Sequence, residues 1–202
     1  MASQGNAIDF EADITLNTIG SVGGGSQTRA CFAGGYSPDA QDADMTYVNI
    51  MTLGASFDFG DLFDGGYTMG SVNSPTRILF AGGGGSPQRN GDIQFKNISS
   101  DGNCVKFGEL TQQRAYCAGT CNPTRGVFHS GQVYGGIFYK NYDYVTMASE
   151  GNATDFGEVL LPKAQMEGGG SNATRGVYAG GYTPTPSGSN TNQIEYESDC
   201  LH

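Results

Sequence analysis

Short stretches in which apolar and polar residues alternate run along the whole chain, and Gly, Asn, Ser and Pro separate them. A two-residue period of this kind is typical of β-strands that bury one face. No segment shows the 3.6-residue apolar period of a surface helix over three turns. The pattern therefore predicts an all-β protein.

One strand-like stretch occurs four times at a nearly constant spacing. Its clearest copy, at residues 174–182, reads Thr-Arg-Gly-Val-Tyr-Ala-Gly-Gly-Tyr, and altered copies begin at Thr28, Thr76 and Thr124. The spacings between the four Thr-Arg pairs are 48, 48 and 50 residues. The copy at Thr124 diverges most, because His129-Ser130 replaces Ala-Gly. A fixed period of this size indicates a chain of repeated supersecondary units.

Further strand-like stretches recur in step with the first. One is aromatic and is centred on Tyr47, Phe95, Tyr144 and Tyr196. Another contains an anchor phenylalanine, which is Phe10, Phe59, Phe107 or Phe156. A weaker stretch before each Thr-Arg pair is a candidate for a fourth, edge strand: residues 15–22, 67–72, 114–119 and 164–169.

Three or four strands in each of four repeats predict a four-bladed β-propeller. Residues 1–10 match residues 147–156 at eight of ten positions, so the N-terminal stretch continues the repeat pattern from the C-terminal end. We therefore expect a single domain over residues 1–202, in which the termini meet and close the ring. The repeats begin near Thr28, Thr76, Thr124 and Thr174, and residues 1–27 complete the last one. An open array of four hairpins is the alternative.

Four of the six arginines occupy the same position in successive repeats: Arg29, Arg77, Arg125 and Arg175. Acidic residues recur on both sides of the anchor phenylalanine: Asp9, Asp58 and Asp155 before it, and Asp61, Glu109 and Glu158 after it. Because a guanidinium can bind a carboxylate through two parallel hydrogen bonds, we expect these arginines and acids to tie one blade to the next. The functional alternative is a ring of arginines that binds an anionic ligand.

The third repeat carries an aromatic loop at residues 132–140, where the other repeats are polar. A loop that departs from the rule of its repeat is a candidate contact surface. The candidate binding residues in this loop and at matching positions are Tyr36, His129, Tyr134, Phe138, Tyr139 and Tyr182. The alternative is that the loop only packs on the rim of the fold.

The charge of the chain restricts its partners. A net charge of −10 argues against nucleic acid and against an anionic membrane surface, since both require a basic face. No apolar run approaches the roughly 20 residues that span a bilayer, and no secretory leader is expected from the first residues. The five cysteines, an odd number, suit buried thiols in a reducing compartment better than a disulfide framework.

No set of residues predicts catalysis, a cofactor or a metal. Cys117 and Cys121 lack the second pair of a zinc site, and the acidic loop at residues 39–44 lacks the glycine and glutamate of an EF-hand. The Gly-Gly pairs lack the lysine and the following helix of a phosphate-binding loop. We therefore expect a protein that is not an enzyme and needs no cofactor.

The repeat motifs are similar to those of a known group of proteins. Thr-Arg-Gly-Val-Tyr-Ala-Gly-Gly-Tyr182, Ile-Glu-Tyr196 and Gly-Asn-Ala-Thr-Asp-Phe-Gly157 resemble the kelch-like repeats of virion structural proteins of marine and cyanobacterial phages. The double glycine followed by an aromatic also resembles the broader kelch pattern, although the chain has no tryptophan. The resemblance covers essentially the whole chain and implies a fibre, tail or capsid-decorating component of the particle, made in the host cytoplasm.

The resemblance implies contact with other virion proteins, self-association, or attachment to a host surface. A glycan-binding propeller is the second hypothesis, because aromatic loops that recur in each repeat can supply several weak sugar sites. A polysaccharide hydrolase is the third, and it requires two carboxylates that face one cleft.

Overall fold

The structure is a computed structural model that describes residues 7, 9–10, 13–14, 18–38, 40–85, 90–133, 135–164, 168–183, 189–190 and 194–197. In this part of the chain every regular element is a β-strand, and all strand pairs are antiparallel. The prediction of an all-β protein is confirmed.

The first three repeats each form a four-stranded sheet, and the fourth forms a three-stranded sheet among the described residues. The strands of the first sheet are β1 (Val22–Gly25), β2 (Arg29–Tyr36), β3 (Gln41–Asn49) and β4 (Phe57–Asp61). Those of the second are β5 (Gly70–Asn73), β6 (Arg77–Ala81), β7 (Asp92–Asn97) and β8 (Val105–Glu109).

The third sheet contains β9 (Ala118–Cys121), β10 (Arg125–His129), β13 (Asn141–Thr146) and β14 (Thr154–Glu158). The fourth contains β15 (Gly168–Ser171), β16 (Gly176–Ala179) and β19 (Ile194–Glu197). Two small hairpins extend from the third and fourth sheets: β11 (Gln132–Val133) with β12 (Ile137–Phe138), and β17 (Tyr182–Thr183) with β18 (Ser189–Asn190).

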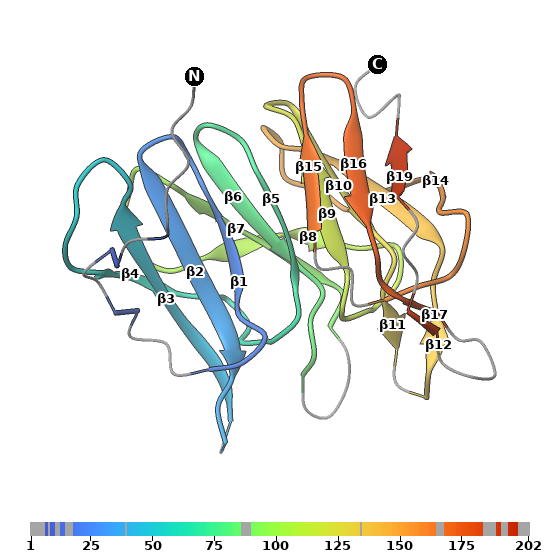
Figure 1. Cartoon of the computed structure of the whole chain (residues 1–202), viewed down its shortest axis with the longest axis horizontal. Coiled ribbons are helices and arrows are strands. Elements are labelled where there is room, and N and C mark those ends of the chain that lie inside the picture. The colour runs from blue at the N-terminus through green and yellow to red at the C-terminus, as the bar shows by residue number, and fades with distance from the viewer. Residues whose placement is uncertain are drawn as a thin grey trace.

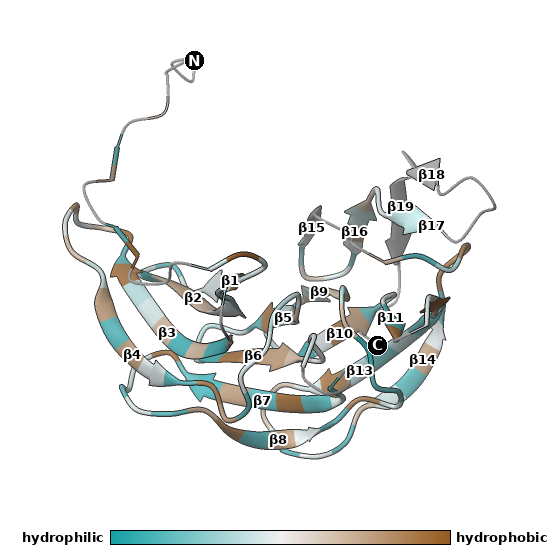
Figure 2. Ribbon diagram, turned by 90° about the horizontal axis from the view of Figure 1, so that it is seen from below, coloured by the Kyte–Doolittle hydropathy of each residue, from teal (hydrophilic) through white to brown (hydrophobic). Residues whose placement is uncertain are grey.

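Each predicted stretch has a fixed place in its sheet. The Thr-Arg stretch is the second strand, the aromatic stretch is the third, and the anchor phenylalanine lies in the fourth. An edge strand does precede each Thr-Arg pair, but it shares only its first residues with the end of each predicted weak stretch. This edge packs against the neighbouring sheets: β5 lies against β1 and β9, and β9 lies against β15. The four sheets therefore follow one another around an arc (Figure 2).

The two ends of the sheets carry connections of different length. Tight turns join the first and second strands of every sheet at one end, at the top of Figure 1. We call this end the turn edge; its turns are residues 25–28, 73–76, 121–124 and 171–174. Longer loops lie at the opposite end, which we call the loop edge; its described residues include 34–38, 40–41, 130–133, 135–140 and 181–183.

The sheets are joined by apolar cores that lie between them. In the first of these, Cys31, Met45 and Phe59 of the first repeat pack with Ile78 and Phe80 of the second. The other two cores combine the second repeat with the third, and the third with the fourth. The second and third sheets thus have a core on both faces and the first and fourth sheets on one, and neighbouring sheets provide the burial that a single sheet of this size lacks.

Backbone hydrogen bonds join the sheets at the loop edge. The amides of Gly35 and Gly83 donate to the carbonyls of Gly66 and Arg114 in the following repeat, at 2.8 and 2.9 Å. Gly131 makes the matching bond to the carbonyl of Lys163, at 2.8 Å. All three glycines have positive φ (125°, 117° and 108°), which disfavours any other residue type. The repeated Gly-Gly pair is thereby explained by contact between the sheets.

A second backbone contact joins each outer strand to the next repeat. The amide of Gly151 donates to the carbonyl of Phe107 (2.9 Å), and the amide of Ala153 donates to that of Glu109 (2.8 Å). Between these acceptors, a Cβ atom at Gly108 would lie 2.1 Å from the carbonyl oxygen of Gly151. The close approach of the two backbones therefore requires glycine at position 108.

Replacing Gly108 with alanine tests this contact. We expect Gly108→Ala to lower the free energy of unfolding by about 2–3 kcal/mol, because the backbones must separate to admit the methyl group. Gly23→Ala is the matched control, since a Cβ there meets its nearest atom at an ordinary 3.7 Å. Urea denaturation measures both variants, and equal midpoints would contradict the requirement.

Candidate functional site

The repeat arginines lie on aromatic rings at the junctions of the sheets. The guanidinium carbon of Arg29 is 4.1 Å from the ring centroid of Tyr47, that of Arg77 is 4.8 Å from Phe95, and that of Arg125 is 4.5 Å from Tyr144. Such contacts combine cation–π attraction with burial of the aliphatic stem. This place on the aromatic strand was not evident from the repeat spacing.

Two of these arginines also reach into the following repeat. Nη1 of Arg29 donates to the carbonyl of Ile98 at 2.8 Å, and Nη1 of Arg77 donates to those of Met147 and Ala148 at 3.2 and 3.1 Å. They therefore tie neighbouring repeats together through backbone carbonyls, and Nη1 of Arg29 also lies 3.7 Å from Oδ1 of Asp101 in the following repeat. Asp101 is not one of the six repeat acids, so the expected pairing of Arg29 and Arg77 with those acids is wrong.

The repeat acids serve their own strands instead. Oδ1 of Asp58 accepts from the amide of Gly60 at 2.7 Å, and Oδ1 of Asp155 accepts from that of Gly157 at 3.1 Å. These bonds lie where the strand pairing shifts register. Glu109 binds Nζ of Lys106 at 2.8 Å. The six acids of this set, Asp9, Asp58, Asp61, Glu109, Asp155 and Glu158, are all exposed.

The turn edge surrounds a hollow. Turns of all four repeats line this space of about 900 Å³, which includes Ser26, Ser74, Asn122 and Asn172. These four residues occupy equivalent positions, and their side-chain oxygens accept hydrogen bonds from the amides of the Thr-Arg pair that follows. The turns are therefore fixed by their own side chains, and the residues that line the hollow carry no charge.

Two pairs of aromatic side chains lie at the loop edge. The rings of Tyr36 and Tyr67, from the first and second repeats, have centroids 5.5 Å apart, and Tyr36 is 42% exposed. Phe138 and Tyr182, from the third and fourth repeats, form a similar pair at 5.8 Å. The structure thus brings Phe138 and Tyr182 together and places Tyr36 with a tyrosine that the sequence had not singled out.

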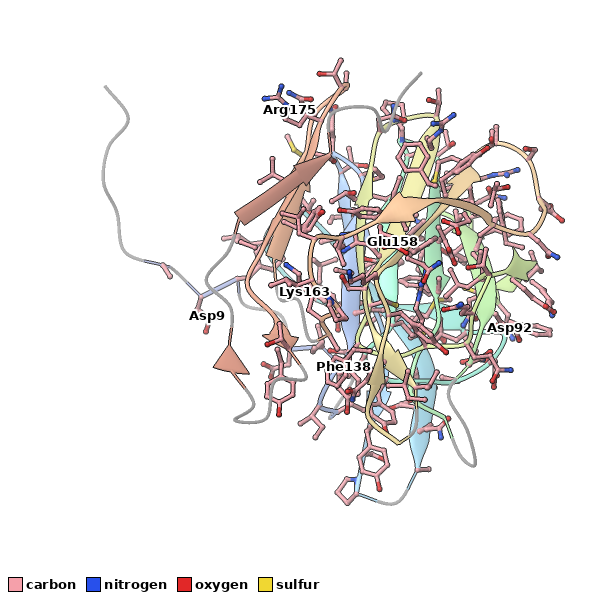
Figure 3. All side chains as sticks on the ribbon, turned by 90° about the vertical axis from the view of Figure 1, so that its right-hand side faces the viewer. Asp9, Asp92, Phe138, Glu158, Lys163 and Arg175 are labelled. Carbon is pink, nitrogen blue, oxygen red and sulfur yellow. The ribbon has the colours of Figure 1, made fainter. Side chains whose placement is uncertain are left out.

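The remaining loop candidates are placed differently. Tyr139 lies half-buried beside Phe138, and Tyr134 lies outside the described residues. In Figure 3 Phe138 lies toward one end of the molecule, Arg175 lies at the other, and Lys163 lies between them. The candidate contact surface is therefore the loop edge with the two aromatic pairs, and we call it the aromatic edge: Tyr36, Tyr67, Phe138 and Tyr182.

His129 does not belong to any surface. It is fully buried, its ring lies 4.3 Å from that of Tyr178 and 5.6 Å from that of Tyr142, and neither ring nitrogen has a hydrogen-bond partner. Burial, with the nearby charges of Arg114 and Lys163, lowers the pKa of His129 to about 3. The prediction that His129 contributes to binding at the surface is wrong, because the residue packs as a neutral aromatic ring between the third and fourth repeats.

A buried ion pair was missed by sequence reasoning. Nη2 of Arg114 lies 2.8 Å from Oδ2 of Asp143, and both side chains are fully buried. Asp143 also accepts from the amide and the hydroxyl of Thr111, at 2.9 and 2.7 Å. The sequence did offer a sign of this ion pair, because the third repeat has Arg114 at the position where the second repeat has Gly66.

Comparison with protein-family models gave no match, and comparison with curated proteins gave none either. Within the described ranges, no three His, Cys, Asp or Glu side chains are grouped as metal ligands would be. No helix of that part is long and apolar enough to cross a membrane.

The buried histidine should make stability depend on pH. The unfolded chain takes up a proton near pH 6.5 whereas folded His129 does so only near pH 3, so stability falls as the pH drops between these values. At pH 5 we expect a loss of about 2 kcal/mol relative to pH 8 from this residue. Urea titrations of the wild type and of His129→Gln measure it, and an unchanged slope against pH in the variant would refute the assignment.

The ion pair should be costly to break and easy to replace. Asp143→Ala leaves the Arg114 guanidinium buried without its partner, so we expect a loss of about 3–5 kcal/mol. The double variant Arg114→Met, Asp143→Leu should recover most of that loss, because it removes both charges. Thermal and urea unfolding compare the three proteins, and a double variant no more stable than Asp143→Ala would argue against the pairing.

Proposed function

We propose that this protein is a non-enzymatic structural or attachment module of a virus particle, folded as a four-bladed propeller, with the aromatic edge as its contact surface. The observation that carries the proposal is the hollow lined by turns of all four repeats. Repeats arranged around a common hollow direct all their loops to the opposite side. The aromatic pairs are thereby presented together on one rigid face.

The two end sheets support closure of the ring. Val177 of the fourth sheet is 39% exposed, whereas the equivalent Cys31, Leu79 and Val127 are at most 1% exposed. On the first sheet Ile50 is 46% exposed, whereas the equivalent Ile98 and Met147 are at most 3% exposed. In the first three sheets the residue equivalent to Val177 is buried because a following sheet covers it. In the second and third sheets the residue equivalent to Ile50 is buried because a preceding sheet covers it.

The exposed faces of the fourth and first sheets carry the same apolar positions by which the other sheets pack together. The fourth sheet has a hollow of about 530 Å³ lined by Gly170, Arg175, Val177 and Ala179. A first sheet seated there would cover the apolar positions of both partners. Arg175 would then reach the carbonyl of Ile50, as Arg29 reaches that of Ile98.

The assignment to a particle rests on the resemblance of the repeats to kelch-like repeats of phage virion proteins. A net charge of −10 fits contact with proteins or neutral sugars better than contact with nucleic acid or an anionic membrane. The proposed partners are other virion proteins, further copies of the chain, or a glycan of the host surface.

A glycan-binding propeller is the second candidate, and the aromatic pairs favour it. Tyr36 with Tyr67 and Phe138 with Tyr182 offer ring faces at two places on one edge. Aromatic faces bind the apolar face of a sugar, and two weak sites on a rigid body act together by avidity.

Binding measurements test both candidates with the same variants. We expect the double variant Tyr36→Ala, Phe138→Ala to weaken binding to purified particles or to a glycan array by roughly 30-fold, since aromatic anchors dominate the energetics of such surfaces. Phe57→Ala is the matched control, because Phe57 is 46% exposed on β4 and lies outside the aromatic edge.

The readouts separate the alternatives. Loss of particle binding alone supports the structural role, and loss of glycan binding alone supports the lectin. Binding that the double variant leaves intact would contradict the aromatic edge as the contact surface.

A further inference from the structure

The hollow at the turn edge has the dimensions of a ligand site. It spans about 900 Å³, and small-molecule sites in proteins occupy roughly 300–1,000 Å³. The turn edge is at the top of Figure 1, at the end of the sheets away from the aromatic edge. A ligand in the hollow would therefore contact a surface that is separate from the proposed contact surface.

The inner strands of successive sheets are in close contact beneath the turns. The amide of Asn73 on β5 donates to Sγ of Cys121 on β9 at 3.3 Å. The hydroxyl of Ser71 donates to the carbonyl of Gly23 at 2.6 Å. A Cβ atom at Gly119 would lie 2.1 Å from the carbonyl oxygen of Ser71. These contacts favour a compact ligand that enters from the turns over a polymer that passes between the sheets.

The third and fourth turns each carry an asparagine whose side-chain oxygen is fully used. Oδ1 of Asn122 accepts from the amides of Thr124 and Arg125 at 2.7 and 2.6 Å, and from the hydroxyl of Thr124 at 3.0 Å. Oδ1 of Asn172 accepts the equivalent three bonds in its own turn. Within the part of the chain that the structure describes, the Nδ2 groups of both residues make no hydrogen bond. Their N–H groups are therefore available to a ligand.

Serine is sufficient to hold these turns. Oγ of Ser26 accepts from the amides of Thr28 and Arg29 at 3.2 Å each. Oγ of Ser74 accepts the equivalent two bonds at 3.3 and 3.0 Å. The asparagines of the third and fourth turns therefore add two N–H donor groups that the turns themselves do not require.

The other residues that line the hollow fit a neutral ligand with hydroxyl groups. Gln27 and Asn73 provide side-chain amides, and Pro75 and Pro123 provide apolar rings. The described lining residues include no charged side chain, and the net charge of −10 repels an anion. Because a hydroxyl group both donates and accepts, it can bind the N–H groups and the oxygens of these amides together.

We propose that the hollow is a binding site for a neutral sugar, held by the side-chain amides of Asn73, Asn122 and Asn172. The proposal goes beyond the proposed function, because the glycan-binding candidate places sugars at the aromatic edge, at the opposite end of the sheets. It requires neither a closed ring nor a virus particle, since turns of all four repeats already line the hollow.

NMR spectra of the full wild-type chain test the place of the site. We expect glucose, galactose, mannose or N-acetylglucosamine, added one at a time, to shift the amide signals of the four turns and to leave those of the loop edge unchanged. N-acetylneuraminic acid, which carries a carboxylate, is the control and should shift neither set. Shifts confined to the loop edge, or no shift with any of the neutral sugars, would overturn the site. Equal shifts of the turns with N-acetylneuraminic acid would overturn the neutral class of ligand.

The variant Asn122→Ser, Asn172→Ser tests the amides while the turns stay intact, since Ser26 and Ser74 hold the equivalent turns. We expect it to weaken binding of the neutral sugar by roughly tenfold, because two hydrogen-bond donors are lost. Its urea midpoint should match that of the wild type. Sugar binding as tight as in the wild type would contradict the role of the two asparagines.

The variant Tyr36→Ala, Phe138→Ala is the matched control for location. It should bind the neutral sugar at the hollow as the wild type does, because both substitutions lie at the opposite end of the sheets. Loss of sugar binding in this variant alone would move the sugar to the aromatic edge, which would overturn the site at the hollow and leave the proposed function standing. Loss in the asparagine variant alone supports the hollow, whatever the outcome of the particle-binding measurements.

Discussion

Close backbone contact between successive sheets is the constraint on which the structure depends. The amides of Gly35, Gly83 and Gly131 donate to the next repeat, and the glycine at position 108 lets an outer strand touch the following turn. A side chain at these places would hold the sheets apart and open the apolar cores between them. The abundance of glycine is thus a property of the junctions as well as of the turns.

The period, the strand stretches and the all-β class were predictable because they depend on local alternation and on self-similarity. The order of strands within a sheet was not, since alternation identifies a strand without naming its partner. The weak stretch that becomes β5 carries little apolar character of its own, yet it packs between β1 and β9. β5 takes this place because its glycine and small residues let the neighbouring strands approach closely, and such residues do not by themselves predict a strand.

The candidate site residues were also predictable only in part. Phe138 was selected because its loop departs from the repeat and Tyr182 because it follows the Gly-Gly pair as Tyr36 does, and they do form a pair. His129 departs from the repeat for a different reason, because it fills a space between Tyr142 and Tyr178 inside the protein. The partners predicted for Arg29 and Arg77 were wrong because every residue type has a backbone carbonyl that accepts hydrogen bonds, so the sequence does not indicate which carbonyl an arginine will bind. Several cations lie inward on rings or carboxylates while the repeat acids face solvent, so the outer strands present a negative surface.

The buried pair of Arg114 and Asp143 has a consequence for assembly of the chain. Both groups belong to the third repeat, and the pair has no equivalent in the repeats before it. At the position of Asp143 the first and second repeats have Thr46 and Gln94, and at that of Arg114 the second has Gly66. A third repeat that folded with Arg114 away from β13 would leave a charge buried without its counter-ion, at a cost of several kcal/mol, on the order of the net stability of a domain. The ion pair therefore holds the segment that enters the third repeat against the third strand of its own sheet.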